Sequence, residues 1–197
     1  MNRIAFVMAA CLVMTACGSN PVGDRYYSLV LAADDVVPAV ESSESDRHLV
    51  IGPVVLPDYL NRRGLAMQVG PNEIITANHH FWAEPLEEGI AKVLVRDIAD
   101  LTSGLTVDRD AGRWSRQGDC RLRIEFDKFH VTDRSRVVSS GRYWISASET
   151  VVKREFDIDE ILYGDGYAQA VAALRQSLKK LSTGIAESIT NDSNCSR

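Results

Sequence analysis

The chain has 197 residues, of which 45% are hydrophobic and 25% charged, and its formal net charge is −5 at pH 7. A mildly acidic chain lacks the basic stripe that nucleic-acid binding requires, so nucleic acid is not expected as a partner. The length suits one domain with a sizeable core.

The chain opens on an apolar run from Ile4 to Ala16, preceded by the basic residue Arg3. A helix that crosses a bilayer needs about 20 apolar residues, so this run is too short to span one. A positive start, a short apolar stretch and small residues at its end are typical of a secretory signal. We therefore predict that residues 1–16 are a signal peptide.

Met14-Thr15-Ala16-Cys17 resembles the bacterial lipobox, in which cleavage precedes the cysteine and its thiol takes a diacylglycerol. Cys17 is thus the predicted lipid anchor, and residues 17–25 form a lipidated tether. Gly18, in place of an Asp, indicates sorting to the outer membrane. The alternative is an ordinary signal cleaved after Ala16, which would leave Cys17 as a stray thiol.

Short strands and turns make up the first part of the predicted domain, which spans residues 26–190 and is followed by a tail at 191–197. Pro53 places its strand at a sheet edge or a bulge, because proline cannot donate a ladder hydrogen bond. The predicted elements are a strand at 26–31, an acidic loop at 32–47, a strand at 48–56, a turn at 57–64, and strands at 66–69 and 73–78.

Two segments have the apolar spacing of amphipathic helices. Apolar residues recur at steps of three and four between Pro85 and Gly104. The same spacing runs from Tyr167 to Ile189, with Asp165 as the predicted cap. Each helix is expected to bury its apolar stripe on a sheet.

Residues 121–131 alternate between apolar and polar side chains, with a change of phase after Phe126. This change predicts a bulge near Asp127 or Lys128. A turn then leads into a second long strand over 137–152, so an extended β-hairpin is expected. The predicted fold is a layered α/β sandwich, in which a mixed β-sheet is flanked by two long amphipathic helices.

Cys120 and Cys195 remain in the mature chain besides Cys17. In an oxidising periplasm an even pair of cysteines favours a disulfide. Two free thiols are the alternative, because Cys195 lies close to a terminus that is expected to fray.

The sequence contains no G-x-S-x-G elbow, Gly-rich phosphate loop, H-E-x-x-H motif or cysteine pair with zinc spacing. His79 and His80 are adjacent, so in a strand they point to opposite faces and cannot share a metal. His130 is interpreted as a core or rim residue of a strand. We interpret the acidic stretch Asp157–Glu160 as a solvated turn. No catalytic residue, metal or cofactor is expected.

Residues 26–29, 54–98 and 165–189 together resemble the ABC-type transport auxiliary lipoproteins of the PqiC/YmbA type. The segment 108–120 and the Cys120/Cys195 pair depart from that pattern. The positions that carry the resemblance are Pro57-Asp58-Tyr59-Leu60, Asn78 with Trp82, Pro85-Leu86 and Asp165-Gly166-Tyr167.

This resemblance implies a mixed sheet flanked by helices in a periplasm-facing lipoprotein of the outer membrane. It also implies a non-catalytic role in an MCE-type intermembrane lipid transport system, which contributes to envelope integrity. The expected partners are an MCE-domain protein and its ABC transporter, with the lipoprotein receiving the far end of an MCE tube as a homo-oligomeric ring.

Two other functions remain open at this point. An outer-membrane assembly or plug lipoprotein would bind a β-barrel and would have no role in MCE transport. A lipid carrier of the soluble type would need an internal apolar cavity, and the two stripes are just wide enough for a packed core.

Apolar side chains outside the periodic stripes mark a possible docking surface. Tyr59 and Leu60 lie in a predicted turn, and Asn78 and Trp82 in a predicted loop before the first helix. One interpretation is that these side chains cap the core beneath their loops. The other is that they contact a neighbouring subunit or the MCE protein, since aromatic anchors carry much of an interface's energy.

Overall fold

The computed structural model describes residues 23–30, 47–109, 120–147, 150–191 and 195. Its elements are, in chain order, β1 (Arg25–Tyr27), β2 (His48–Val55), the 3-10 turn η2 (Asp58–Leu60), β3 (Gly64–Gly70), β4 (Glu73–Trp82), α2 (Leu86–Leu101), β5 (Thr106–Arg109), β6 (Cys120–Thr132), β7 (Arg136–Ala147), β8 (Thr150–Ile161) and α3 (Tyr167–Asn191).

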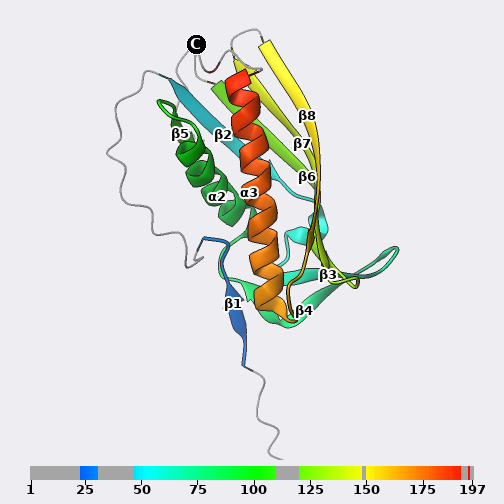
Figure 1. The fold of residues 1–197 in the computed structure, drawn as a ribbon. Helices are drawn as coiled ribbons and strands as arrows, with labels where there is room; N and C mark the ends of the chain where they lie inside the picture. The colour runs from blue at the N-terminus through cyan, green and yellow to red at the C-terminus, as the bar shows by residue number, and fades with distance from the viewer. Residues whose placement is uncertain (1–22, 31–46, 110–119, 148–149, 192–194, 196–197) are drawn as a thin grey trace, which may run out of the picture.

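The eight strands form one mixed sheet that divides at β6 (Figure 1). One edge of β6 pairs antiparallel with β7, which pairs with β8. On its other edge, the first half of β6 pairs parallel with β2, and β2 with β5. The second half pairs parallel with β3, and the β3–β4 hairpin leads to β1. The turn η2 joins β2 to β3 and so links the two branches.

Both helices lie on the same face of the sheet (Figure 1). Helix α2 packs on β2 and β5, and α3 packs on β7 and β8. A buried ion pair joins the helices, because Arg175 donates to the two carboxylate oxygens of Asp97 at 2.8 and 2.7 Å. A bidentate pair of this kind is among the stronger charged hydrogen bonds.

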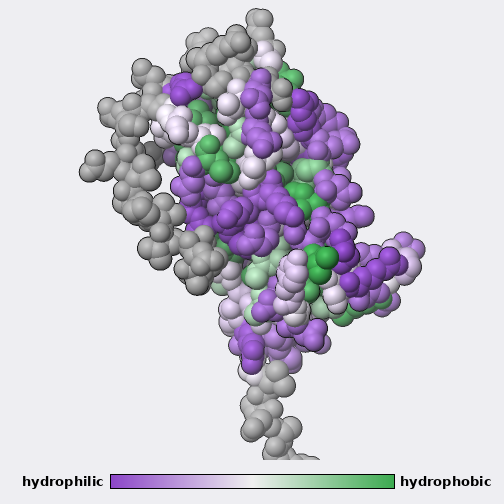
Figure 2. Space-filling view, in the orientation of Figure 1, coloured by the Kyte–Doolittle hydropathy of each residue, from purple (hydrophilic) through white to green (hydrophobic). Residues whose placement is uncertain are grey.

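The predicted fold class is confirmed. Along β7, buried and half-buried residues alternate over the whole strand, because one face of the sheet covers the core and the other meets solvent. The surface over the helices is mostly hydrophilic, with scattered apolar residues (Figure 2). The two predicted helices are both present and bury one stripe each.

The predicted bulge is also present, because the register of β6 against β7 shifts between Phe126 and Lys128. Gly141 lies opposite this shift. A Cβ atom at this position would lie 2.1 Å from the carbonyl oxygen of Glu125, so no side chain fits there.

The extent of the predicted hairpin is wrong, because β7 ends at Ala147 and a third strand, β8, follows over 150–161. The acidic residues of 157–160 therefore lie in a strand and not in a turn. Val152, Phe156 and Ile158 are half-buried at a period of two, which is the signal that the sequence interpretation missed.

Three smaller expectations also change. Pro53 lies at a register shift of β2 against β6 between Ile51 and Val54, which is the bulge alternative, and the pairing of β2 with β5 on the other side ends at Ile51. The first strand has three residues only. The strand predicted at 73–78 continues to Trp82.

Candidate functional site

Two loops enclose a groove of about 330 Å³. One wall is formed by residues 60–63, from the last residue of η2 to the start of β3. The other is formed by residues 82–87, which lead from β4 into α2. The amide of Trp82 donates to the carbonyl of Arg63 at 2.8 Å and holds the walls together. We call this feature the α2 groove.

The α2 groove brings together two of the residues predicted at the docking surface. Leu60 and Trp82 both line it, yet they are only 3% and 7% exposed and belong to the hydrophobic core. They therefore form its apolar floor. This burial is what the core-cap interpretation expects, whereas the loops around them supply the accessible walls.

The predicted loop over 78–82 is wrong, because this segment belongs to β4. β1 comes from a distant part of the chain and pairs with His80–Trp82, which extends the strand. Before that point β4 is irregular: Ala66 pairs with Thr76, but Gly64 pairs with Phe81. Asn78 lies in this irregular stretch and is exposed.

Tyr59 lies beside the groove and bonds to a buried histidine. Its hydroxyl is 2.8 Å from His130 Nδ1, and His130 Nε2 is 3.3 Å from Gln68 Oε1. Burial lowers the pKa of His130 to about 4, and the nearby charge of Lys128 acts in the same direction. The neutral ring thus accepts from Tyr59 and donates to Gln68. Burial raises the pKa of Tyr59, so its phenol stays protonated.

The rims of the α2 groove carry opposite charges. Arg62 and Arg63 are exposed on one wall, and Glu84 and Glu87 lie on the other. Glu84 is paired with Lys92 of α2. The groove thus combines a buried apolar floor with rims of opposite charge. The sequence interpretation overlooked the arginine pair, although two adjacent cations in a turn were visible.

The predicted cysteine sites lie in different regions. Cys17 and residues 1–16 are outside the described residues. Cys120 and Cys195 are bonded, with an S–S distance of 2.10 Å and a Cα–Cα distance of 5.7 Å. Both residues are buried. The bond joins the first residue of β6 to the segment after α3.

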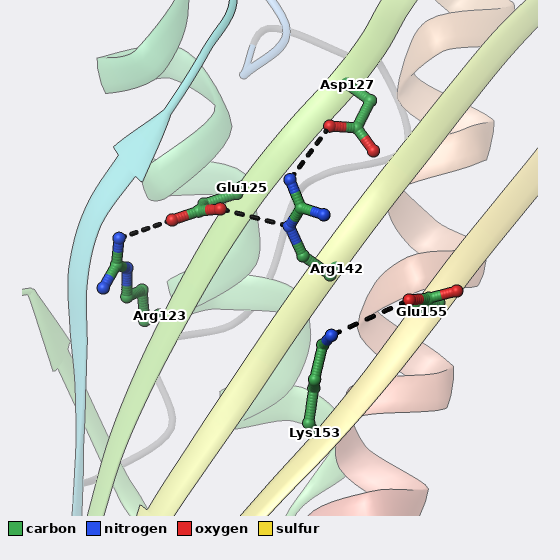
Figure 3. A network of polar contacts seen from close by, with 6 residues as sticks. All are labelled: Arg123, Glu125, Asp127, Arg142, Lys153 and Glu155. Carbon is green, nitrogen blue, oxygen red and sulfur yellow. Dashed lines mark hydrogen bonds and ion pairs between the residues drawn. The ribbon is translucent and has the colours of Figure 1, made fainter.

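The outer face of the sheet, away from the helices, carries a network of charges (Figure 3). Glu125 lies between Arg123 and Arg142, and Arg142 also donates to Asp127 at 3.4 Å. The hydrogen bond from Arg142 is the main reason that the pKa of Glu125 is lowered. These charges neutralise one another across neighbouring strands. Asp127, Arg142 and Glu155 also border an open depression of about 470 Å³ on this outer face.

The two adjacent histidines face opposite sides of β4, as expected. His79 Nδ1 is 3.1 Å from Asp24, and His80 bonds to the Tyr27 hydroxyl at 2.8 Å. His80 also stacks on Tyr167 of α3, with 3.7 Å between ring centroids. Within the described ranges, no group of three or more His, Cys, Asp or Glu residues is placed to hold a metal. None of the described helices has the length and apolarity to cross a membrane.

Comparison with known sequences gives a match over most of the chain. Residues 27–186 fit the family described as the ABC-type transport auxiliary lipoprotein component. The chain is 25% identical over 183 residues to the intermembrane transport lipoprotein PqiC of Escherichia coli K12, covering 93% of this chain and 95% of that protein. The PqiC of Shigella flexneri matches equally well.

Comparison with solved structures agrees with the fold. A crystal structure of an uncharacterized protein matches with a TM-score of 0.73 and 26% identity, covering 85% of this chain and 99% of that one. A crystal structure of a Xanthomonas campestris protein matches with a TM-score of 0.59 and 16% identity, covering 73% of this chain and 83% of that one.

Proposed function

Because the chain belongs to the ABC-type transport auxiliary lipoproteins, we propose that it is a non-catalytic, outer-membrane component of an MCE-type intermembrane lipid transport system. The observation that carries this proposal is the family match over residues 27–186, together with relatives of nearly the same length that are named intermembrane transport lipoproteins. The site that would serve the role is the α2 groove.

The anchor in this proposal is the lipid on Cys17. One acyl chain gives only marginal membrane binding, whereas a ring of subunits multiplies the anchors and stays attached. Replacing Cys17 by Ala should release a soluble periplasmic form or leave an uncleaved precursor. Fractionation of the envelope measures this, and a variant that stays with outer membranes after a high-salt wash would contradict the anchor.

In this role a ring of these lipoproteins at the outer membrane receives the end of the MCE tube. The ABC transporter of the system lies in the inner membrane. The α2 groove supplies one contact of the assembly, either with a neighbouring subunit or with the MCE protein. Its buried floor, Leu60 and Trp82, keeps the walls in place, and the rim residues Arg62 and Glu87 are available to a partner.

A non-catalytic role agrees with the contacts of the polar residues. In β8, Asp159 pairs with Arg136 and Glu160 pairs with Lys180 of α3. His130 is held neutral by burial between Tyr59 and Gln68. Each of these groups has a structural partner, which weakens the case for an acid–base pair.

A lipid carrier is the less favoured alternative. A hollow lined by core side chains, among them Met67, Phe129 and Leu174, has a volume of only about 10 Å³. This is close to the smallest space that holds one water, so it cannot take a lipid chain. A lipoprotein that binds a β-barrel remains the other alternative, and co-purification separates it from the proposed function.

The decisive experiment purifies the acylated protein from membranes and identifies what comes with it. An MCE-domain protein supports the proposal, whereas a β-barrel without an MCE protein contradicts it. The groove is tested with Arg62→Glu on its exposed rim, and Lys179→Glu on α3 is the matched control.

We expect Arg62→Glu to keep the melting temperature of the wild type and to weaken assembly or MCE binding about tenfold or more, as removal of an interface hot spot does. The control should bind normally. Trp82→Ala should instead lower the melting temperature, because Trp82 is in the core. Normal assembly and MCE binding by Arg62→Glu would exclude the groove as a contact.

A further inference from the structure

We propose that an aromatic and basic cluster beside β1 rests on the anionic phospholipid leaflet that holds the lipid anchor. The cluster consists of Tyr26, Phe81 and Arg63 on one face of the β1–β4 pair, together with Arg25 on the opposite face of β1, and we call it the β1 cluster. The inference depends on the proposed anchor at Cys17 and goes beyond it, because a flexible anchor alone does not decide which surface faces the membrane.

In the aromatic part of the β1 cluster, Tyr26 is exposed and Phe81 is half-buried. Tyr26 is 55% exposed and lies opposite Phe81 in the register of β1 and β4, with 5.7 Å between the ring centroids. The guanidinium of Arg63 lies 5.7 Å from the centroid of the Phe81 ring. Tyr and Arg side chains combine an apolar body with a polar tip, which is the composition favoured at the lipid headgroup level.

The position of β1 is determined by contacts on both of its faces, although the strand has three residues only. Asp24 bonds to His79 at 3.1 Å on one face, and Tyr27 bonds to His80 at 2.8 Å on the other. The amide of Ala83 also donates to the carbonyl of Tyr27 at 2.8 Å. The point at which the chain enters the domain is therefore held beside the cluster.

The length of the preceding chain keeps this end of the domain close to the membrane. Seven residue steps separate Cys17 from Asp24, which span about 25 Å at most when fully extended. Helix α3 has 25 residues and is about 37 Å long. It begins at the β1 end, where Tyr167 stacks on His80, and runs toward the end that bears the C-terminus (Figure 1). The β1 end therefore lies nearest the lipid.

The charge of the cluster suits an anionic surface. Arg25 and Arg63 are exposed, and within the described part of the chain neither has an ion-pair partner. The neighbouring carboxylate of Asp24 bonds to His79, and the two arginines leave a local positive charge, against a net charge of −5 for the whole chain. Each basic residue close to an anionic leaflet increases partition onto it by about fivefold.

The test uses the chain from residue 18, which retains the whole described core from Leu29 onward and lacks the anchor. The probes are vesicles of phosphatidylethanolamine with about 30% phosphatidylglycerol and vesicles of phosphatidylcholine alone. We expect sedimentation with the anionic vesicles only, weakening as salt is raised. Arg25→Ser with Arg63→Ser should reduce partition by about tenfold or more.

The control is Arg121→Ser with Lys179→Ser, which removes the same charge from other surfaces and should change partition by less than about twofold. Arg25 lies in β1, so its substitution also changes a strand residue. Arg63 lies outside every strand, so a loss of partition in the single variant Arg63→Ser is not an effect on strand formation. Equal losses in the test and control pairs would overturn the proposal, as would the absence of binding to anionic vesicles.

A second measurement uses the acylated protein in the same vesicles. Amide hydrogen exchange at residues 24–27 and 61–64 should be slower on anionic than on phosphatidylcholine vesicles, and exchange in the middle of α3 should not differ. Equal exchange at 24–27 and 61–64 in both vesicles would contradict the proposed contact. Fractionation of Cys17→Ala tests the anchor separately, so the two failures are distinguishable.

Discussion

His130 shows how the surroundings of one residue determine its protonation. The side chain is 3% exposed and bonds to Tyr59 in η2 and to Gln68 in β3, so it connects both segments to β6. Its pKa is about 4 in the folded protein, against an ordinary value of 6.5. The nearby charge is that of Lys128, which further disfavours a cation.

This difference in pKa predicts a loss of stability in acid. Below about pH 6.5 the unfolded chain binds a proton at His130 that the folded protein does not bind until about pH 4. The free energy of unfolding should therefore fall as the pH is lowered from about 6.5 to 4, by up to about 1.4 kcal/mol per pH unit. Above about pH 6.5 this loss should be absent. Urea unfolding at several pH values measures the slope.

The variant His130→Gln cannot titrate at this position. The stability difference between wild type and His130→Gln should shrink as the pH falls from about 7 to 4.5. His48→Gln serves as the control. It keeps His130, so its stability should fall in acid as that of the wild type does. A constant difference between wild type and His130→Gln across this range would show that His130 does not determine the acid response.

At the scale of elements, the β6–β7 pair depends on a glycine at the bulge. A Cβ on residue 141 would lie 2.1 Å from the Glu125 carbonyl oxygen and 2.9 Å from the Phe126 Cα. These are backbone atoms, so they cannot move without disturbing the ladder. Gly141→Ala should lower the free energy of unfolding by about 2 kcal/mol or more, measured by chemical denaturation.

Gly184, inside α3, is the matched control. A Cβ at this position would meet nothing within 4 Å. Gly184→Ala should therefore stabilise the protein by about 0.5–1 kcal/mol, because alanine loses less conformational freedom in a helix. Opposite signs for the two substitutions are expected, and a loss of similar size in both would argue against the steric account of Gly141.

At the scale of the whole molecule, the bond between Cys120 and Cys195 closes a loop across 75 residues of sequence. In the chain-entropy model a loop of this length contributes about 4–5 kcal/mol. Non-reducing mass spectrometry should find the linked peptides, and reduction should lower the free energy of unfolding. A variant with Ser at both positions should no longer respond to the reductant. Two alkylatable thiols in protein from an oxidising compartment would contradict the bond.

Local spacing in the sequence determined much of this protein. The stripe of Ile90, Leu94 and Ile98 made a helix predictable, and the change of phase after Phe126 predicted the bulge. Helix and strand have fixed periods, so the face of each side chain follows from its position in the chain. For β8 the same period was present, but the charges among its apolar residues obscured it.

Tertiary structure alone decided which distant segments meet. The extension of β4 to Trp82 depends on β1, and the division of the sheet depends on β2 and β3 both reaching β6. The α2 groove and the neutral His130 arise from these pairings. Spacing along a chain sets the faces of an element, whereas strand pairing and the burial of a polar group depend on residues far away in sequence.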